Sequence, residues 1–121
     1  MGHPYILVVD DDASIRQLVL AVLGDMDYPV RSAQDGRAAL QLAGEETPAL
    51  VLLDMRMPIM DGWEFSRRLR EDVGDVPVIV MTAARDAADW AREVNAKGYV
   101  AKPFELDDLI RAVEGALPQS A

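Results

Sequence analysis

Acidic residues directly after apolar runs are the residues in this sequence best suited to chemistry. Asp10, Asp11 and Asp12 follow one such run, and Asp54 follows another at 50–53. Carboxylates that lie close together repel one another, so one must take up a proton or a cation must compensate. Hard oxygen ligands favour Mg²⁺ or Mn²⁺ over zinc, and such an ion can bridge a carboxylate and a phosphoryl oxygen. The pattern predicts phosphoryl transfer, with Asp54 as an oxygen nucleophile that forms an aspartyl phosphate.

A hydroxyl and an ammonium group follow two further apolar runs. Thr82 and then Ala83 come after 78–81, and Lys102 comes after 98–101. The Thr82 hydroxyl, the Ala83 backbone N–H and the Lys102 ammonium are suited to holding phosphoryl oxygens. Each could by itself be a solvated loop residue or a helix cap, and we expect Asp12 and Ser14 to be caps. If these polar residues were unrelated, they would be expected at both edges of a sheet. Their occurrence together after the apolar runs therefore favours a functional site.

The apolar runs that precede these residues are typical of strands. The segments 5–9, 50–53 and 78–81 are apolar at both odd and even positions, as in strands buried on both faces. The segment 98–101 is a shorter example. The segment 30–33 is half polar, which predicts an edge strand.

Between these strands, apolar residues recur at helical spacing. The predicted helices are a stripe from Ile15 to Leu23 that Gly24 ends, then 35–43, 62–72, 86–94, and a stripe from Leu106 to Leu117 that Pro118 ends. Five alternations of strand and helix predict an α/β fold, a doubly wound five-stranded parallel sheet with helices on both faces. Sites in that fold lie beyond the carboxyl ends of the strands, where the strand order switches.

The composition favours one soluble domain over residues 1–121, with 118–121 as a short tail. Its 21 acidic residues outnumber 12 basic ones, and the net charge of −9 argues against direct binding to nucleic acid or an anionic membrane. Without cysteine there is no disulfide and no thiol nucleophile. The N-terminus has no basic signal-peptide region, and no apolar stretch is long enough to span a bilayer. We expect a cytoplasmic protein.

Four motifs together resemble the receiver domains of two-component response regulators, the family of the chemotaxis regulator CheY. They are ILVVDDD at 6–12, LVLLDMRMPIMDG at 50–62, VPVIVMTA at 76–83 and GYVAKPF at 98–104. They occur in the family's order and spacing, and the resemblance covers nearly the whole chain. The resemblance implies a flavodoxin-like sheet with strand order 2-1-3-4-5. It also implies a signalling phosphoacceptor rather than an enzyme.

The resemblance implies roles for the acidic residues. Asp54 matches the phosphoacceptor, and Asp10 and Asp11 match the acidic pair that holds Mg²⁺ (or Mn²⁺), with Asp11 as the direct ligand. Arg56 matches the position whose backbone carbonyl binds the metal, and its side chain would either cover the phosphate or lie on the rim. Gly62 matches a turn where glycine frees the backbone.

The resemblance also implies a switch. Thr82 matches the switch hydroxyl, Lys102 the phosphate-binding lysine and Tyr99 the aromatic that changes rotamer. The bond between Lys102 and Pro103 matches one that the family commonly holds cis. Asn95 stands where the family usually has glycine, and asparagine tolerates the left-handed conformation.

The partners follow from the same resemblance. A sensor histidine kinase or a phosphotransfer protein would supply the phosphoryl group to Asp54. The surface formed by the fourth helix, fifth strand and fifth helix would then bind a downstream protein or a fused output domain, as a monomer or as a homodimer promoted by phosphorylation. We favour a stand-alone protein over a receiver excised from a larger transcriptional regulator, because the final residues show no start of a charged linker.

An enzyme is the other functional class that the motifs allow. Residues 10–14 resemble the D-x-D-x-[TV] motif of haloacid-dehalogenase-like phosphatases, apart from Ser14 at the last place. In that reading the nucleophile is Asp10 rather than Asp54. A calcium loop that starts at Asp10 fails, because Ile15 stands where glycine is needed.

Two aromatic residues have simpler interpretations. Trp90 shares a helical stripe with Ala87, Ala91 and Val94, which favours core packing over a partner contact. Trp63 and Phe65 cannot both face the core, so one of them must be partly exposed.

Overall fold

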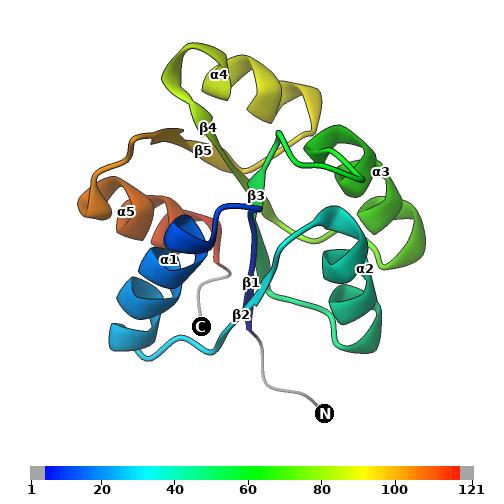
Figure 1. Ribbon diagram of the computed structural model, residues 1–121, viewed down its shortest axis with the longest axis horizontal. Helices are drawn as coiled ribbons and strands as arrows, with labels where there is room; N and C mark the ends of the chain where they lie inside the picture. The colour runs from blue at the N-terminus through cyan, green and yellow to red at the C-terminus, as the bar shows by residue number, and fades with distance from the viewer. Residues whose placement is uncertain (1–4, 118–121) are drawn as a thin grey trace.

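Five strands alternate with five helices in the computed structural model, which describes residues 5–117 (Figure 1). In chain order the elements are β1 (Ile6–Val9), α1 (Ala13–Asp25), β2 (Val30–Ala33), α2 (Gly36–Glu45), β3 (Leu50–Asp54), α3 (Gly62–Asp72), β4 (Val78–Ala83), α4 (Ala84–Glu93), β5 (Gly98–Lys102) and α5 (Leu106–Ala116). The predicted tail at 118–121, with Pro118, lies outside the described residues.

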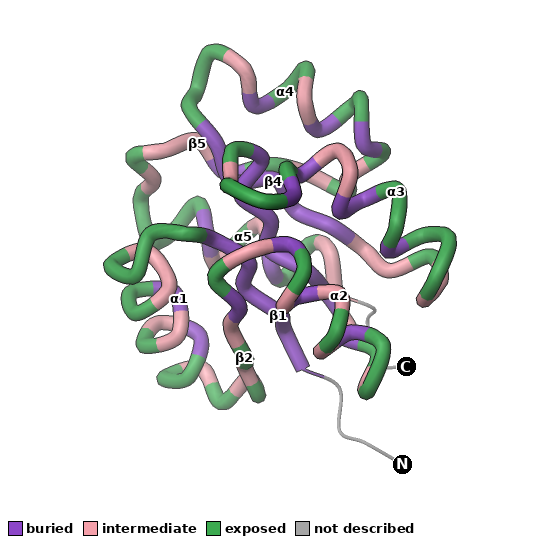
Figure 2. Tube along the Cα trace, turned by 45° about the vertical axis from the view of Figure 1, so that its right-hand side comes forward, coloured by how far each residue is buried: buried purple, intermediate pink, exposed green. Residues whose placement is uncertain are grey.

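All neighbouring strands are parallel, in the order β2-β1-β3-β4-β5, and this confirms the predicted topology. α1 and α5 pack on one face of the sheet, and α2, α3 and α4 pack on the other (Figure 1). Alternate strand residues serve the two faces: Ile6 and Val8 contact the first pair of helices, whereas Leu7 and Val9 contact the second group. This explains why β1 is apolar at every position and buried along its whole length (Figure 2). β2 lies at the edge of the sheet, as its half-polar sequence predicts.

Three of the predicted strands extend one or two residues farther than their apolar runs. β3 includes Asp54, β4 continues to Ala83, and β5 includes Lys102. Asp54, Thr82 and Lys102 therefore belong to the sheet itself, whereas Asp10 and Asp11 follow the end of β1. Backbone pairing with the neighbouring strand fixes their positions.

The helix predictions need four corrections. α4 begins at Ala84, two residues earlier than predicted, directly after β4 and without a capping side chain that could have signalled its start. Asp12 caps α1 as predicted, but Ser14 lies inside the helix. Leu18, within the stripe from Ile15 to Leu23, and Leu106, at the start of the last stripe, fit the helical spacing of a buried face but are 42 % and 45 % exposed. Other residues of α1 and α5 fill the contact with the sheet: Val19, Leu23, Leu109 and Val113.

Within residues 5–117, no helix combines the length and the apolar character needed to cross a membrane.

Tyr5 ties the start of β1 to the end of α2. Its Oη donates a hydrogen bond of 2.6 Å to the carbonyl oxygen of Glu46, beyond the last turn of that helix. We expect Tyr5→Phe to lower the free energy of unfolding by about 1 kcal/mol, the usual net value of one hydrogen bond. Urea unfolding measures this loss, with Tyr28→Phe as the control on a tyrosine that is only partly buried. Equal losses in both variants would contradict this role for the Tyr5 hydroxyl.

Candidate functional site

Three carboxylates converge at the carboxyl ends of β1 and β3. Each of Asp10, Asp11 and Asp54 has an oxygen within 4.8 Å of the others. They meet because Val9 and Leu53 are register partners on adjacent strands, so the residues that follow lie side by side. Asp10 is fully buried and Asp54 is 6 % exposed, whereas Asp11 faces solvent. This arrangement matches the edge of the sheet that the sequence predicts.

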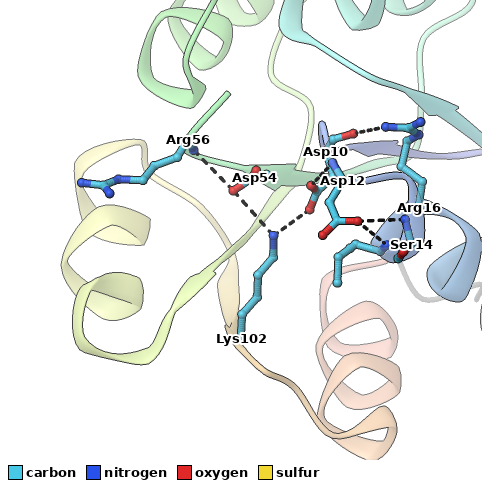
Figure 3. A network of polar contacts seen from close by, with 8 residues as sticks. Asp10, Asp12, Ser14, Arg16, Asp54, Arg56 and Lys102 are labelled. Carbon is cyan, nitrogen blue, oxygen red and sulfur yellow. Dashed lines mark hydrogen bonds and ion pairs between the residues drawn. The ribbon is translucent and has the colours of Figure 1, made fainter. Parts of the chain in front are cut away.

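Lys102 brings an ammonium group into this cluster from β5 (Figure 3). Its Nζ is 2.8 Å from Oδ2 of Asp10 and 3.7 Å from Oδ1 of Asp54. β5 is separated from β3 by β4, so the long side chain reaches across the end of one strand. One lysine is thus shared between two carboxylates of the three.

The loop after β1 is held by hydrogen bonds on both sides of Asp10. The backbone N–H of Asp12 donates to Oδ1 of Asp10 at 2.9 Å, and the Asp12 side chain accepts from the Ser14 N–H at 2.8 Å. Arg16 Nη1 donates to the carbonyl oxygen of Asp10 at 2.7 Å (Figure 3). We did not predict this role for Arg16. A single arginine in the first turns of a helix has no sequence spacing that would predict such a contact. Its side chain reaches the loop because of the direction in which α1 runs.

Burial and repulsion disfavour the charged form of Asp54. Burial, and next the Asp10 carboxylate, raise the pKa of Asp54 from 3.8 to about 6, against the opposing effects of Lys102 and the Arg56 N–H. The cluster therefore carries more negative charge than Lys102 compensates. Its donors are all carboxylate oxygens, which fit Mg²⁺ or Mn²⁺ and do not fit a metal that prefers sulfur or nitrogen ligands.

Thr82 and Ala83 lie at the end of the strand next to Asp54. Asp54 pairs with Met81, so Thr82 is one residue farther along the same edge of the sheet. Thr82 is 4 % exposed, and Ala83 faces solvent. Tyr99 is separate from the cluster: it pairs with Val80, before the strand end, and is 49 % exposed.

Arg56 contacts Asp54 only through its backbone. Its N–H donates to Oδ1 of Asp54 at 3.3 Å, while its side chain points away from the carboxylate (Figure 3). The guanidinium carbon lies 5.6 Å from the ring centroid of Trp90. In this structure the Arg56 side chain therefore lies on the rim of the site, against Trp90.

The loop after Asp54 contains two unusual backbone positions. Ile59 has φ of 73°, and Gly62 lies so close to Met55 that a Cβ atom would stand 2.7 Å from Met55 Cα. Gly62 itself has no positive φ, so glycine is needed here for close approach rather than for a free backbone angle.

Two further backbone predictions are confirmed elsewhere in the chain. Asn95 adopts a left-handed φ of 60°, and the bond between Lys102 and Pro103 is cis.

We expect Gly62→Ala to lower the free energy of unfolding by about 2 kcal/mol, because the new methyl group collides with backbone that cannot easily move. Gly44→Ala is the matched control, since nothing lies within 4 Å of its Cβ position in α2. That control should keep or raise stability, because alanine favours helix. Thermal unfolding of both variants tests the contact, and equal stability of the two would contradict it.

A doubly wound parallel sheet with an acidic cluster and a lysine at its carboxyl edge defines an α/β domain with a candidate cation and phosphate site. The family model for the response regulator receiver domain matches residues 6–114. The chain belongs to this family of two-component signalling proteins.

Solved structures of the family have the same fold. The chain is similar to the chemotaxis response regulator CheY4 of Vibrio cholerae, with a TM-score of 0.85 and 32 % identity over 96 % of this chain and 100 % of that chain. It is similar to the receiver domain of NtrX from Brucella abortus, with a TM-score of 0.87 and 33 % identity over 95 % of this chain and 99 % of that chain.

Curated relatives are longer than this chain. The response regulator MprA of Mycolicibacterium vanbaalenii is 39 % identical, over 93 % of this chain and 49 % of the relative. A probable transcriptional regulator, ycf27, of Guillardia theta is 44 % identical, over 89 % of this chain and 44 % of the relative. The chain spans about half the length of these curated relatives.

Proposed function

We propose that the domain accepts a phosphoryl group on Asp54 from a phosphohistidine of a sensor histidine kinase or a phosphotransfer protein. An Asp54 oxygen attacks phosphorus, the phosphorus–nitrogen bond breaks, and the departing imidazole nitrogen takes up a proton. The observation that carries this proposal is the convergence of Asp10, Asp11 and Lys102 on a buried Asp54.

The hydrogen bonds support Asp54 over Asp10 as the nucleophile. Both oxygens of Asp10 have close partners, the Asp12 N–H on Oδ1 and the Lys102 ammonium on Oδ2. Within residues 5–117, the polar contacts of Asp54 fall on Oδ1 alone. Its Oδ2 is therefore the better placed oxygen for attack. This weighs against the phosphatase alternative, which needs Asp10.

The acidic residues would hold a divalent cation. Asp10, Asp11, Asp54 and the backbone carbonyl of Arg56 are the proposed ligands of Mg²⁺ or Mn²⁺, with Asp10 acting largely through water. When bound, the ion neutralises charge on the phosphoryl oxygens and favours their approach to the carboxylates. The Thr82 hydroxyl, the Ala83 N–H and the Lys102 ammonium would hold the other phosphoryl oxygens.

The output would come from the surface of α4, β5 and α5. Thr82 moves toward the phosphoryl group, and Tyr99, now 49 % exposed, turns inward. The surface then binds a downstream protein, a fused output domain or a second copy of the chain. We propose that the protein works in the cytoplasm. The length of the transcriptional regulators among its relatives supports a fused output domain as an alternative to a stand-alone regulator.

Intact mass after incubation with acetyl phosphate tests the proposal. We expect one Mg²⁺-dependent phosphoryl adduct on the wild type and complete loss of it in Asp54→Asn. An adduct that survives in Asp54→Asn but disappears in Asp10→Asn would instead support the phosphatase. Absence of any adduct on a folded wild type, as judged by circular dichroism, would overturn both.

A further inference from the structure

Arg56, Trp63, Trp90 and Glu93 form a cluster, the arginine–tryptophan cluster, between the site and two helices. The Arg56 guanidinium lies over the Trp90 ring, 5.6 Å from its centroid and within the range of a cation–π contact. Trp90 meets Trp63 edge to face at 4.8 Å, and Trp63 Nε1 donates to Glu93 Oε1 at 2.8 Å. The cluster thus joins the loop after Asp54 to α3 and α4.

Phosphorylation of Asp54 would change the charge balance beside Arg56. Lys102 and the proposed divalent cation would balance the three carboxylates, because three negative charges would meet one and two positive charges. A phosphoryl group on Asp54 replaces one negative charge with two, which leaves one negative charge without a counterion.

Arg56 is the guanidinium best placed to supply that counterion. Arg16 is engaged with the carbonyl oxygen of Asp10. Arg56 has its backbone N–H on Asp54 Oδ1, so its side chain starts beside the acceptor carboxylate. It is exposed, and its partner in the unphosphorylated state is an aromatic ring. A charge-assisted hydrogen bond to phosphate is stronger than a cation–π contact at an exposed site.

We propose that Trp90 is a positioning residue that holds the Arg56 guanidinium away from the unphosphorylated site and releases it to the phosphoryl oxygens when Asp54 is phosphorylated. Departure of Arg56 removes one contact between the Asp54 loop and the α3-facing side of α4. The effect of phosphorylation is therefore transmitted to α4 through Arg56 and Trp90 as well as through β4 and β5. This inference rests on the proposed function, since it needs the phosphoryl group on Asp54.

Nuclear magnetic resonance of the arginine side chains tests the proposal on the isotope-labelled full chain. Arg56→Lys assigns the Arg56 Nε–H signal by its disappearance. In the unphosphorylated wild type we expect this signal to be displaced upfield by the Trp90 ring current, and Trp90→Leu to abolish the displacement. Acetyl phosphate with Mg²⁺ should abolish it in the wild type too and move the signal downfield. The Arg92 signal is the control, because that α4 side chain pairs with Asp89.

A fluorescence measurement supplies an independent readout. Trp63→Phe leaves Trp90 as the sole tryptophan and keeps an aromatic edge against it. We expect its emission to change as the adduct forms and to stay constant when Asp54→Asn is added to that background.

The mass of the same samples separates two kinds of failure. An adduct on Asp54 with an unmoved Arg56 signal would overturn the inference alone. So would an Arg56 signal that Trp90→Leu leaves unchanged before phosphorylation. No adduct on the wild type would overturn the proposed function, and the inference with it.

Discussion

Replacing Lys102 with methionine is expected to lower the free energy of unfolding by about 3 kcal/mol in buffer that contains a metal chelator. Asp10 is fully buried, and its Oδ2 has the Lys102 ammonium as its partner at 2.8 Å. Methionine keeps most of the apolar length of the side chain and removes the ammonium group. The variant thus leaves a buried carboxylate without its counterion, and that is far costlier than the loss of an exposed ion pair.

Lys97→Met is the matched control, because Lys97 is the other lysine of the chain and is exposed at the opposite end of β5. Urea unfolding of both variants measures the difference. We also expect Mg²⁺ to restore part of the stability of Lys102→Met, because a divalent cation compensates the same carboxylates. A loss in Lys102→Met no larger than that in Lys97→Met would contradict the role of Lys102 as counterion.

The position of the site could be predicted because it depends on strand ends alone. Strands buried on both faces are apolar at every position, so the first polar residue marks where each strand leaves the core. Asp10, Asp54 and Thr82 follow that rule, and the parallel order of the strands brings them to one edge. No knowledge of the helices is needed for that inference.

Side-chain directions could not be predicted in the same way. The contact of Arg16 with the Asp10 carbonyl depends on the orientation of α1, and that of Arg56 with Trp90 depends on where α4 packs. The sequence suggests that glycine at position 62 frees the backbone, but glycine is needed there because Met55 lies so close, and only the folded loop creates that contact. Leu18 satisfies the helical stripe and yet faces solvent, because periodicity does not fix how wide the buried face is.

Asp54→Asn is expected to raise the free energy of unfolding by up to about 3 kcal/mol at about pH 8 when divalent metal is chelated. The pKa of Asp54 rises from 3.8 to about 6 on folding, first because of burial and then because of Asp10. Asparagine keeps the shape and carries no charge, so the variant avoids the cost of ionising this buried group. A substitution at the proposed phosphoacceptor should therefore stabilise the fold while it abolishes phosphorylation.

The sign of the pH dependence follows from the raised pKa. A carboxyl whose pKa is higher in the folded state stabilises the fold while it is protonated, and that stability is lost as pH rises through about 6. The wild type should match Asp54→Asn in stability near pH 4, fall behind it as pH rises from about 4 to about 6, and keep the full gap above that range. Thermal unfolding over this range measures the gap, with exposed Asp75→Asn as the control. A gap that does not change with pH would contradict the cause we give.

Asp54→Asn and Lys102→Met both test whether the cluster of three carboxylates carries excess negative charge. One variant removes a negative charge from the cluster and should stabilise the metal-free fold, whereas the other removes the positive charge and should destabilise it. Mg²⁺ should reduce the difference in unfolding free energy between the wild type and each variant. In the metal-free protein the negative charge is compensated by protonation of Asp54 or by the Lys102 ammonium, and a bound Mg²⁺ would compensate the same charge. If Mg²⁺ changed neither difference, the three carboxylates would not be its site. Asp54 would then have to accept a phosphoryl group without that compensation.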